Sequence, residues 1–396
     1  GLGTSQLIGS LSGSGSVILD RVGGTLGVSG GANSTFSGVN TYTGGTTVSS
    51  GRLVATNPTG DYANRAALEF AIASDRDFTT PVAIGPATPN EISGSGNFTK
   101  SGAGTLTMIK PSTYTGGTTI SGGRLVDPAP HGDYVNNAAL EFRIAEDQGS
   151  YSLVSGTGSL TKSGPASLAM YTRQTYTGST AITEGSIDLA YVDNILPTGT
   201  DLTIGSAGTF GFIASSQKVA SLSGAGTVSL GDAAFAVDGA ASTTFSGTIL
   251  GDGSFTKAGA GTLTLSGSNT YTGGTAIKGG TLRMGQNNAL PTTSKVDVAS
   301  GATLDVYGNL QSLGALTGAG RVELRDSGRL SVAGNGSTFA GAISGGGSFT
   351  KTGSGTFTLS GVSDYTNGTR VLDTGTLRVT GAISGNLNVA PNATFE

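Results

Sequence analysis

Internal repetition is the feature that most constrains the fold of this 396-residue chain. Leu196-Pro197 and Leu290-Pro291 begin two copies of a 94-residue unit, and the landmarks in both copies follow in the same order. The first copy contains GSFTKAGAGTLTLSG, NTYTGGT and GGTL, and the second contains GSFTKTGSGTFTLSG, SDYTNGT and TGTL. Degenerate copies lie upstream at 97–125 and 159–187. Such a chain is expected to fold as a repeat architecture rather than as separate globular domains.

A second duplication interrupts the repeats in the first half of the chain. It consists of GDYANRAALEFAIA at 60–73 and GDYVNNAALEFRIA at 132–145, in a region where proline and charge accumulate. Residues 55–92 and 126–150 are therefore predicted to be repeat-breaking insertions with loops that bulge from the repeat. The best-preserved repeat units are 196–289 and 290–383.

Apolar residues alternate with polar ones over very short stretches between glycines, as in Thr262-Leu263-Thr264-Leu265. This period of two indicates strands of about three to five residues, and no helical stripe of useful length is present. Many short strands on a long repeat leave propellers and solenoids as candidates. A propeller blade of about 40 to 50 residues, usually with aromatic anchors, fits poorly with a 94-residue unit that lacks Trp.

We therefore predict an all-β fold over residues 1–396, a single right-handed parallel β-helix (solenoid) that is one continuous fragment of a longer protein. About 17 coils of roughly 23 residues, stacked at ~4.8 Å, would form an elongated rod of roughly 80 Å. Glycine would supply corners that need positive φ or a tight bend. The side chains predicted to point inward are Leu263, Leu265, Leu282, Phe357, Leu359 and Leu377.

Four lysines recur at one position of the repeat, each after a Thr in an FTK or LTK block. Because repetition alone explains their equivalence, we predict a structural role for them. A charge at a strand end would keep a coil edge soluble and discourage lateral pairing. These residues are Lys100, Lys162, Lys257 and Lys351.

Composition excludes several kinds of function. The chain has no Cys and a single His, so Cys/His metal centres and sites with several imidazoles are excluded, and no cofactor or metal ligand is predicted. A net charge of −4 without a Lys/Arg cluster argues against a nucleic-acid partner. The apolar runs are only a few residues long, far from the roughly 20 that a membrane helix needs.

The string GSFTKAGAGTLTLSGSNTYTGGTAIKGGTL at 253–282 resembles the passenger-associated transport repeat, also called the autotransporter-associated β-strand repeat. The copies at 97–125 and 347–377 resemble it well, and those near 159 and 34 are eroded. This resemblance implies the passenger domain of a type V secreted bacterial autotransporter. Such a passenger is exported through the periplasm, threaded through a C-terminal outer-membrane barrel of the same precursor and folded at the cell surface.

Catalytic motifs in the chain are explained by its composition. Ser29 in Gly-Val-Ser-Gly-Gly matches a nucleophile elbow, but a chain this rich in Gly and Ser gives such a match by chance. His131 follows a proline in an insertion, so we predict a solvated loop histidine, and Asp75-Arg76-Asp77 is interpreted as a solvated loop tip. Gly251-Asp252-Gly253 is a single turn, unlike a tandem calcium-binding repeat. No catalytic residue is predicted.

Three function classes follow from this sequence. The preferred one is a non-catalytic adhesin or aggregation scaffold, secreted to the cell surface and monomeric, whose partners are host or neighbouring-cell surface molecules. The alternatives are an inert stalk that displays an upstream enzyme such as a subtilisin-like protease, and a polysaccharide-active β-helix enzyme. Tyr62 and Tyr134 each follow Gly-Asp in the duplicated insert and are the candidate binding residues, interpreted as exposed contact aromatics. Burial of both rings against a coil corner is the competing interpretation.

Overall fold

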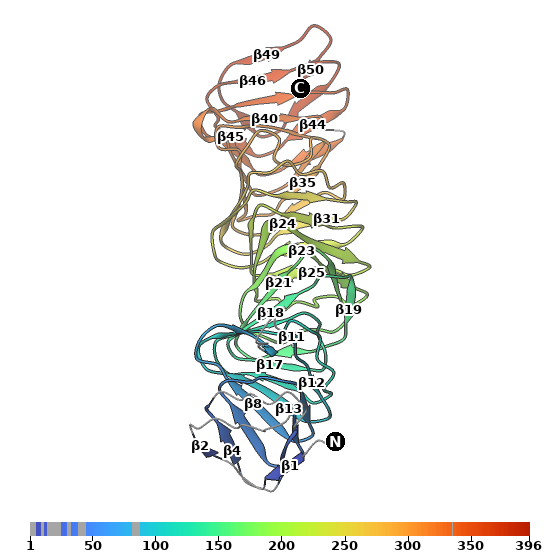
Figure 1. Cartoon of the computed structure of the whole chain (residues 1–396). Helices are drawn as coiled ribbons and strands as arrows, with labels where there is room; N and C mark the ends of the chain where they lie inside the picture. Colours follow the sequence, from blue (N-terminus) through green and yellow to red (C-terminus); the bar gives the residue numbers. More distant parts are fainter. Residues whose placement is uncertain are drawn as a thin grey trace. The chain divides into compact units, whose positions relative to one another are not determined.

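The computed structural model describes residues 5–8, 12–13, 25–29, 33–38, 45–80, 88–334 and 336–396. The chain divides into two compact units, Gly1–Ala181 and Ile182–Glu396. Each unit is a parallel β-solenoid, in which short strands of successive turns stack in register (Figure 1). Among the described residues the only helical segment is the 3₁₀ turn η1 (Arg325–Ser327), and none forms a helix long and apolar enough to cross a membrane.

The first unit has three ladders of parallel strands. The first ladder is β1 (Ser5–Ile8), β3 (Thr25–Val28), β5 (Thr46–Val48), β7 (Tyr62–Asn64) and β12 (Ile92–Ser93). The second is β2 (Ser12–Gly13), β4 (Asn33–Phe36), β6 (Arg52–Ala55), β8 (Ala67–Ala71), β13 (Asn97–Ser101), β15 (Thr118–Ile120), β17 (Tyr134–Asn136) and β20 (Val154–Ser155). The third is β9 (Arg76–Asp77), β14 (Thr105–Thr107), β16 (Arg124–Asp127), β18 (Ala139–Arg143) and β21 (Ser159–Ser163). Outside them, β10 (Thr79–Thr80) pairs antiparallel with β11 (Thr88–Pro89), and β19 (Gln148–Ser150) pairs with β22 (Ser167–Met170). The strand β23 spans Thr180–Ala190.

The second unit repeats this plan, with three ladders that we name by a member strand. The β31 sheet is β25 (Gln217–Val219), β28 (Ala234–Val237), β31 (Ser254–Lys257), β33 (Thr275–Ile277), β35 (Lys295–Val298), β38 (Ala315–Gly318), β41 (Ser337–Phe339), β44 (Thr356–Leu359), β47 (Thr376–Val379) and β50 (Thr394–Phe395). The β32 sheet is β24 (Asp201–Ile213), β26 (Ser221–Gly224), β29 (Thr243–Phe245), β32 (Thr262–Leu265), β34 (Thr281–Met284), β36 (Thr303–Asp305), β39 (Arg321–Glu323) and β42 (Ala342–Ser344). The long strand β24 also starts a short separate ladder with β27 (Thr227–Ser229) and β30 (Thr248–Leu250). The β43 sheet is β37 (Leu310–Leu313), β40 (Arg329–Val332), β43 (Ser348–Lys351), β46 (Thr369–Val371) and β49 (Leu387–Val389), and β45 (Val362–Ser363) pairs with β48 (Ala382–Ile383).

Alternation along each strand builds the core. In β32 and β44, Thr lies outside while Leu or Phe is buried, as expected for strands with one face on a core. All six side chains predicted to point inward, Leu263, Leu265, Leu282, Phe357, Leu359 and Leu377, are buried, so this prediction is confirmed. The all-β parallel solenoid is confirmed as well, and its right-handedness and rod shape stay predictions.

The length of a turn differs from the sequence-based prediction. Phe255 pairs in register with Thr275, which pairs with Val296, so one turn takes 20 or 21 residues rather than the predicted 23. The 94-residue repeat therefore spans about four and two-thirds turns, not four. As a consequence β31 and its repeat equivalent β43 lie in different sheets, and the equivalent of β32 lies in the β31 sheet. Successive copies of the repeat are thus rotated by one face around the solenoid.

Some glycines are required by the close approach of successive turns rather than by positive φ. A Cβ atom on Gly361 would lie 2.1 Å from the carbonyl oxygen of Gly341, and one on Gly341 would lie 1.9 Å from that of Gly320. Neither residue has a φ in the left-handed region. The backbone of one turn therefore rests directly on the next at this corner, which only glycine allows.

The duplicated segments do not bulge as predicted. Residues 60–71 and 132–143 form β7, β8, β17 and β18, which pair in register with the turns before and after them. Each contains a tight corner held by a buried asparagine: Asn136 donates from Nδ2 to the Ser159 carbonyl (2.8 Å) and accepts from the Ala138 amide (3.2 Å). The Asn64 side chain makes the equivalent bonds. The GDYxNxAALEF motif is therefore part of the solenoid wall.

Only the first duplicated segment leaves the regular path. Tyr62 pairs with Ile92 thirty residues later, whereas its equivalent Tyr134 pairs with Val154 twenty residues later. The ten extra residues lie between Phe78 and Ile92, around the antiparallel pair β10 and β11. We call residues 79–91 the excursion; residues 81–87 within it lie outside the described part of the chain.

Candidate functional site

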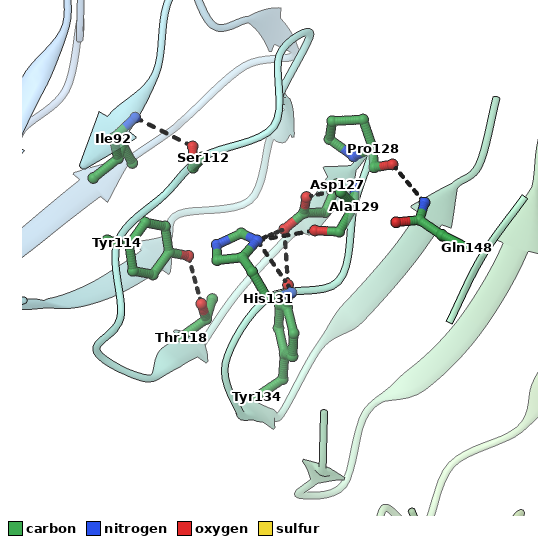
Figure 2. A network of polar contacts seen from close by, with 10 residues as sticks. All are labelled: Ile92, Ser112, Tyr114, Thr118, Asp127, Pro128, Ala129, His131, Tyr134 and Gln148. Atoms are coloured by element: carbon green, nitrogen blue, oxygen red, sulfur yellow. Dashed lines mark hydrogen bonds and ion pairs between the residues drawn. The ribbon is translucent and has the colours of Figure 1, made fainter. Parts of the chain in front are cut away.

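A buried polar cluster closes the turn between β16 and β17 in the first unit (Figure 2). It contains Asp127 at the end of β16, His131 in the connecting turn and Tyr134 at the start of β17. The turn is short because Thr118 pairs with Tyr134, only sixteen residues later. Contacts among these side chains join the end of β16 to the start of β17 and so hold the short turn closed.

The carboxylate of Asp127 is the centre of this cluster. Its Oδ1 accepts a hydrogen bond from the Ala129 amide (3.1 Å), and its Oδ2 accepts one from the Tyr134 hydroxyl (3.0 Å). Burial raises the pKa of Asp127, while His131, the Ala129 amide and the Tyr134 hydroxyl oppose the rise. Burial and the nearby Asp127 carboxylate also raise the pKa of Tyr134 well above its usual value.

His131 is not the solvated loop histidine that the sequence suggested. Its side chain is 16% exposed, and Nδ1 lies 2.9 Å from the carbonyl oxygen of Ala129 and 3.6 Å from Asp127 Oδ2. The ring meets Tyr114 edge to face, with centroids 4.5 Å apart. The short turn folds the imidazole inward because Tyr114 and Tyr134 provide a wall of rings on either side. His131 is therefore packed rather than available to an external substrate.

The exposure predicted for Tyr62 and Tyr134 is wrong. Both rings are fully buried in the core, as the competing interpretation had it. Tyr62 packs edge to face on Phe70 at 5.0 Å, and Tyr134 packs the same way on Phe142 at 5.3 Å. The Gly-Asp before each Tyr belongs to a tight corner, and this local context turns the ring inward. Neither ring is exposed to a partner.

The repeat lysines were predicted to place a charge at a soluble coil edge, but they lie inside the solenoid. All four side chains are buried. The Nζ of Lys100 donates to the carbonyl oxygens of Ser101, Gly102 and Gly122 at 2.8, 3.0 and 3.0 Å, and Gly122 belongs to the next turn. Burial lowers the pKa of Lys100 to about 8. The ammonium group thus ties two turns together at a corner.

A second repeated contact was missed at the sequence level. In each of four copies a buried Tyr hydroxyl meets the hydroxyl of the Thr four residues later, at 2.5 to 2.6 Å. The TYTGGT motif carries this signal, because its Tyr and last Thr keep a constant spacing. The pairs are Tyr114–Thr118, Tyr176–Thr180, Tyr271–Thr275 and Tyr365–Thr369. They close the corner before the next strand.

The described residues bring no catalytic constellation together. Ser29 follows β3, and no hydrogen bond or ion pair in this part of the structure joins it to His131 or to a carboxylate. Arg76, from the predicted loop tip, is half-buried and donates from Nη1 to Asn57 Oδ1 (3.1 Å). Over the same residues, no group of three His, Asp or Glu side chains is placed to hold a metal ion.

The surface presents one exposed aromatic pair that sequence reasoning missed. Tyr151 is 76% exposed, and its ring stacks on Tyr171 with centroids 4.8 Å apart and planes 22° apart. Gly149 makes room for this arrangement, because a Cβ there would lie 2.7 Å from Cε2 of Tyr171. The two residues stand one turn apart, a relation that only the turn length reveals.

Comparisons with known proteins agree with this repeat-built solenoid. Five segments match the family described as passenger-associated-transport-repeat: 26–55, 98–126, 160–189, 255–284 and 349–379. The chain is similar to the adhesin BmaC autotransporter of Brucella suis, with 32% identity over 470 aligned positions that cover 96% of this chain and 14% of that protein. It is also similar to the uncharacterized protein YuaQ of Escherichia coli, with 41% identity over 80 residues, 20% of this chain and 6% of that protein. No solved structure matches the chain.

The chain therefore spans only a small part of the length of the relatives it matches. Within that part, two contacts give a physical reason for the residues that recur in the repeat. The buried Lys joins consecutive turns of the solenoid, and the Tyr–Thr pair closes a corner. Five transport repeats, and similarity to an adhesin autotransporter over nearly the whole chain, show that it belongs to the autotransporter passengers built on passenger-associated transport repeats.

Proposed function

We propose that this chain is a non-catalytic part of a surface-exposed adhesin, which supports attachment to host cells or aggregation with neighbouring cells. The observation that carries this proposal is the similarity to an adhesin autotransporter across 96% of the chain. The polypeptide would be exported by the type V pathway through a C-terminal barrel of the same precursor and remain at the cell surface.

The physical character of the wall supports a binding role. The outward positions of the strands are mostly Thr, Ser and Ala, as in β31 and β33, so most of the wall is a neutral polar surface. Specific contacts would therefore come from the places that depart from this pattern. The excursion at 79–91 and the stacked pair Tyr151–Tyr171 are two such places in the first unit.

Solenoid folding also suits secretion. Each turn pairs mainly with the turns next to it, so burial grows stepwise as the chain leaves a pore. The repeated Lys and Tyr–Thr contacts use residues within about one turn of each other. A passenger of this kind can fold without first making distant contacts.

Two assays test this proposal together. The purified chain is incubated with pectin, chitin, hyaluronate and casein, and the same chain is displayed on non-adherent bacteria through an autotransporter barrel. We expect no hydrolysis, and faster sedimentation or stronger attachment than with the barrel displayed alone. Hydrolysis by the pure chain would refute the scaffold function. Equal attachment at equal display would refute the adhesive one.

A further inference from the structure

A groove of about 660 Å³ lies over the outer face of the β43 sheet in the second unit. Its lining comes from β37, β40, β43, β46 and β49 and from the turns between them. The lining side chains include two arginines, several hydroxyl groups and three asparagines, and none is Asp or Glu. The groove is therefore a positive, hydrogen-bonding surface on a chain whose net charge is −4.

The two arginines lie on the strands on either side of β43, Arg329 on β40 and Arg370 on β46. Arg329 pairs in register with Ser348 of β43, and Arg370 pairs with Thr350, two residues further along β43. Their strands are separated by β43, so the arginines stand about 9.6 Å apart along the stack at ~4.8 Å per strand. Asn388 continues the row beyond Arg370.

Neither arginine is engaged within the described chain. Over those residues, no ion pair or side-chain hydrogen bond involves Arg329 or Arg370. Other arginines of this unit are neutralised by acids, as Arg283 is by Asp305 (2.8 Å) and Arg378 is by Glu396 (2.7 Å). The groove thus presents guanidinium groups that remain free to bind an anion.

Comparison with another copy of the repeat shows that the fold does not need these arginines. In the copy around β31, the position that pairs with Ser254 is Ala234, where the last copy has Arg329. The position that pairs with Thr256 is Ala276, where the last copy has Arg370. The strand geometry is the same in both copies, so the arginines are a departure from the repeat and not a part of its packing.

A third difference between these copies also makes the last copy more positive than the earlier one. Ala276 is followed in its row by Asp297, whereas Arg370 is followed by Asn388. The earlier copy therefore carries a negative charge and no positive one at these three positions. The last copy carries two positive charges and none that is negative.

We propose that the β43 groove binds an acidic polysaccharide, with Arg329 and Arg370 on its carboxylate or sulfate groups. Guanidinium groups bind such planar or tetrahedral anions through paired N–H donors. The Ser, Thr and Asn side chains between them supply donors and acceptors for sugar hydroxyls. No aromatic side chain lines the groove, so bases of single-stranded nucleic acid would find no stacking surface.

This inference deepens the proposed adhesive function, on which its biological use rests, by naming a ligand class. It also places a binding surface within 290–383, one of the two best-preserved repeat units. The site belongs to the second unit alone and needs neither the excursion nor the exposed tyrosine pair.

Calorimetric titration of the full chain tests the site. The probes are an oligogalacturonate for carboxylates, a heparin oligosaccharide for sulfates, neutral dextran and a single-stranded DNA oligonucleotide. We expect binding of one or both acidic oligosaccharides, weaker at higher salt, and none of dextran. The double variant R329A/R370A is expected to bind about tenfold more weakly or not at all. The charge-matched control R325A/R378A should bind like the wild type.

A transplanted site gives the complementary test. The variant A234R/A276R/D297N recreates the three positions on the β31 sheet and should add binding capacity for the acidic oligosaccharide. Unchanged binding in R329A/R370A, equal loss in the control or preference for DNA would overturn the proposal. If the displayed wild-type chain still mediates attachment while no acidic oligosaccharide binds, the polysaccharide site fails and the adhesive function stands.

Discussion

At the scale of single residues, the repeat lysines combine an apolar stem with a charged end that is kept inside the wall. The Lys100 stem lies in the core, and its ammonium group is held by three carbonyl oxygens at a corner. Those carbonyls would otherwise be left short of donors where the backbone leaves the sheet. The lysine therefore supplies hydrogen-bond donors to the carbonyl groups of a buried corner, and burial there lowers its pKa.

This arrangement predicts how stability depends on pH. The pKa of Lys100 is about 8 in the folded chain and about 10.4 in the unfolded one, so between these values only the unfolded chain keeps the proton. The free energy of unfolding contributed by Lys100 therefore rises as pH rises from 8 to 10.4. In K100M this rise is absent, and at pH 7 the variant should lose about 1 to 3 kcal/mol because carbonyl acceptors lose their donor.

Urea unfolding of wild type and K100M at pH 7, 9 and 10 measures this difference. The control is K110M, since Lys110 is half exposed and paired with Glu91. A constant gap between wild type and K100M across this range would contradict the assignment.

At the scale of strands and corners, glycine has two separate tasks. Some corners use positive φ, as at Gly345, but the column Gly320–Gly341–Gly361 uses the absence of a side chain so that turns can touch. This second task explains part of the high glycine content that corner conformation alone does not. It also makes the spacing between turns sensitive to a single methyl group.

Substitution at this column tests the stacking. G361A places a Cβ 2.1 Å from a carbonyl oxygen of the preceding turn, so we expect a loss of about 1 to 3 kcal/mol in the free energy of unfolding. In G346A the new Cβ would meet nothing within 4 Å, and its stability should change by less than about 0.5 kcal/mol. Equal effects from the two variants would show that the turns do not approach each other as described.

The excursion can be removed with a template from the same chain. Replacing residues 79–91 by the Tyr-Ser-Leu of 151–153 gives the first duplicated segment the twenty-residue turn of the second. The solenoid should keep its far-ultraviolet circular dichroism and melting temperature, because β7, β8 and β12 retain their partners. Cells displaying this variant should attach less than wild type if the excursion makes contacts. Full attachment would move the contact surface to the solenoid walls.

The strands and the core were predictable from sequence, because alternation in Thr262 to Leu265 directly reports which side chains are buried. The turn length was not, since a 94-residue period fits four turns of 23 as well as four and two-thirds turns of about 20. That choice depends on register, which only the pairing of Phe255 with Thr275 reveals. The burial of His131 was equally hidden, because composition made its segment look like a loop. For Tyr62 the sequence left exposure and burial as competing interpretations, and only the structure decides between them.

At the scale of the whole chain, repetition provides a uniform wall and substitution within the repeat provides local chemistry. Because the last copy of the 94-residue repeat is turned by one face relative to the copy before it, changes at one repeat position appear on different sides of the second unit. Arg370 in the β43 sheet and Ala276 in the β31 sheet show this directly. A passenger can thus vary its binding surfaces without altering how its turns pack.

The most direct measurement of the central claim is the number of bacteria attached per host cell at matched surface display. It compares cells that display this chain through an autotransporter barrel with cells that display the barrel alone, after both display levels have been quantified with the same epitope tag. The adhesive scaffold predicts several times more attached bacteria with the chain, and a reduction when purified chain is added as competitor. Equal attachment with and without the chain, at equal display of folded protein, would contradict it.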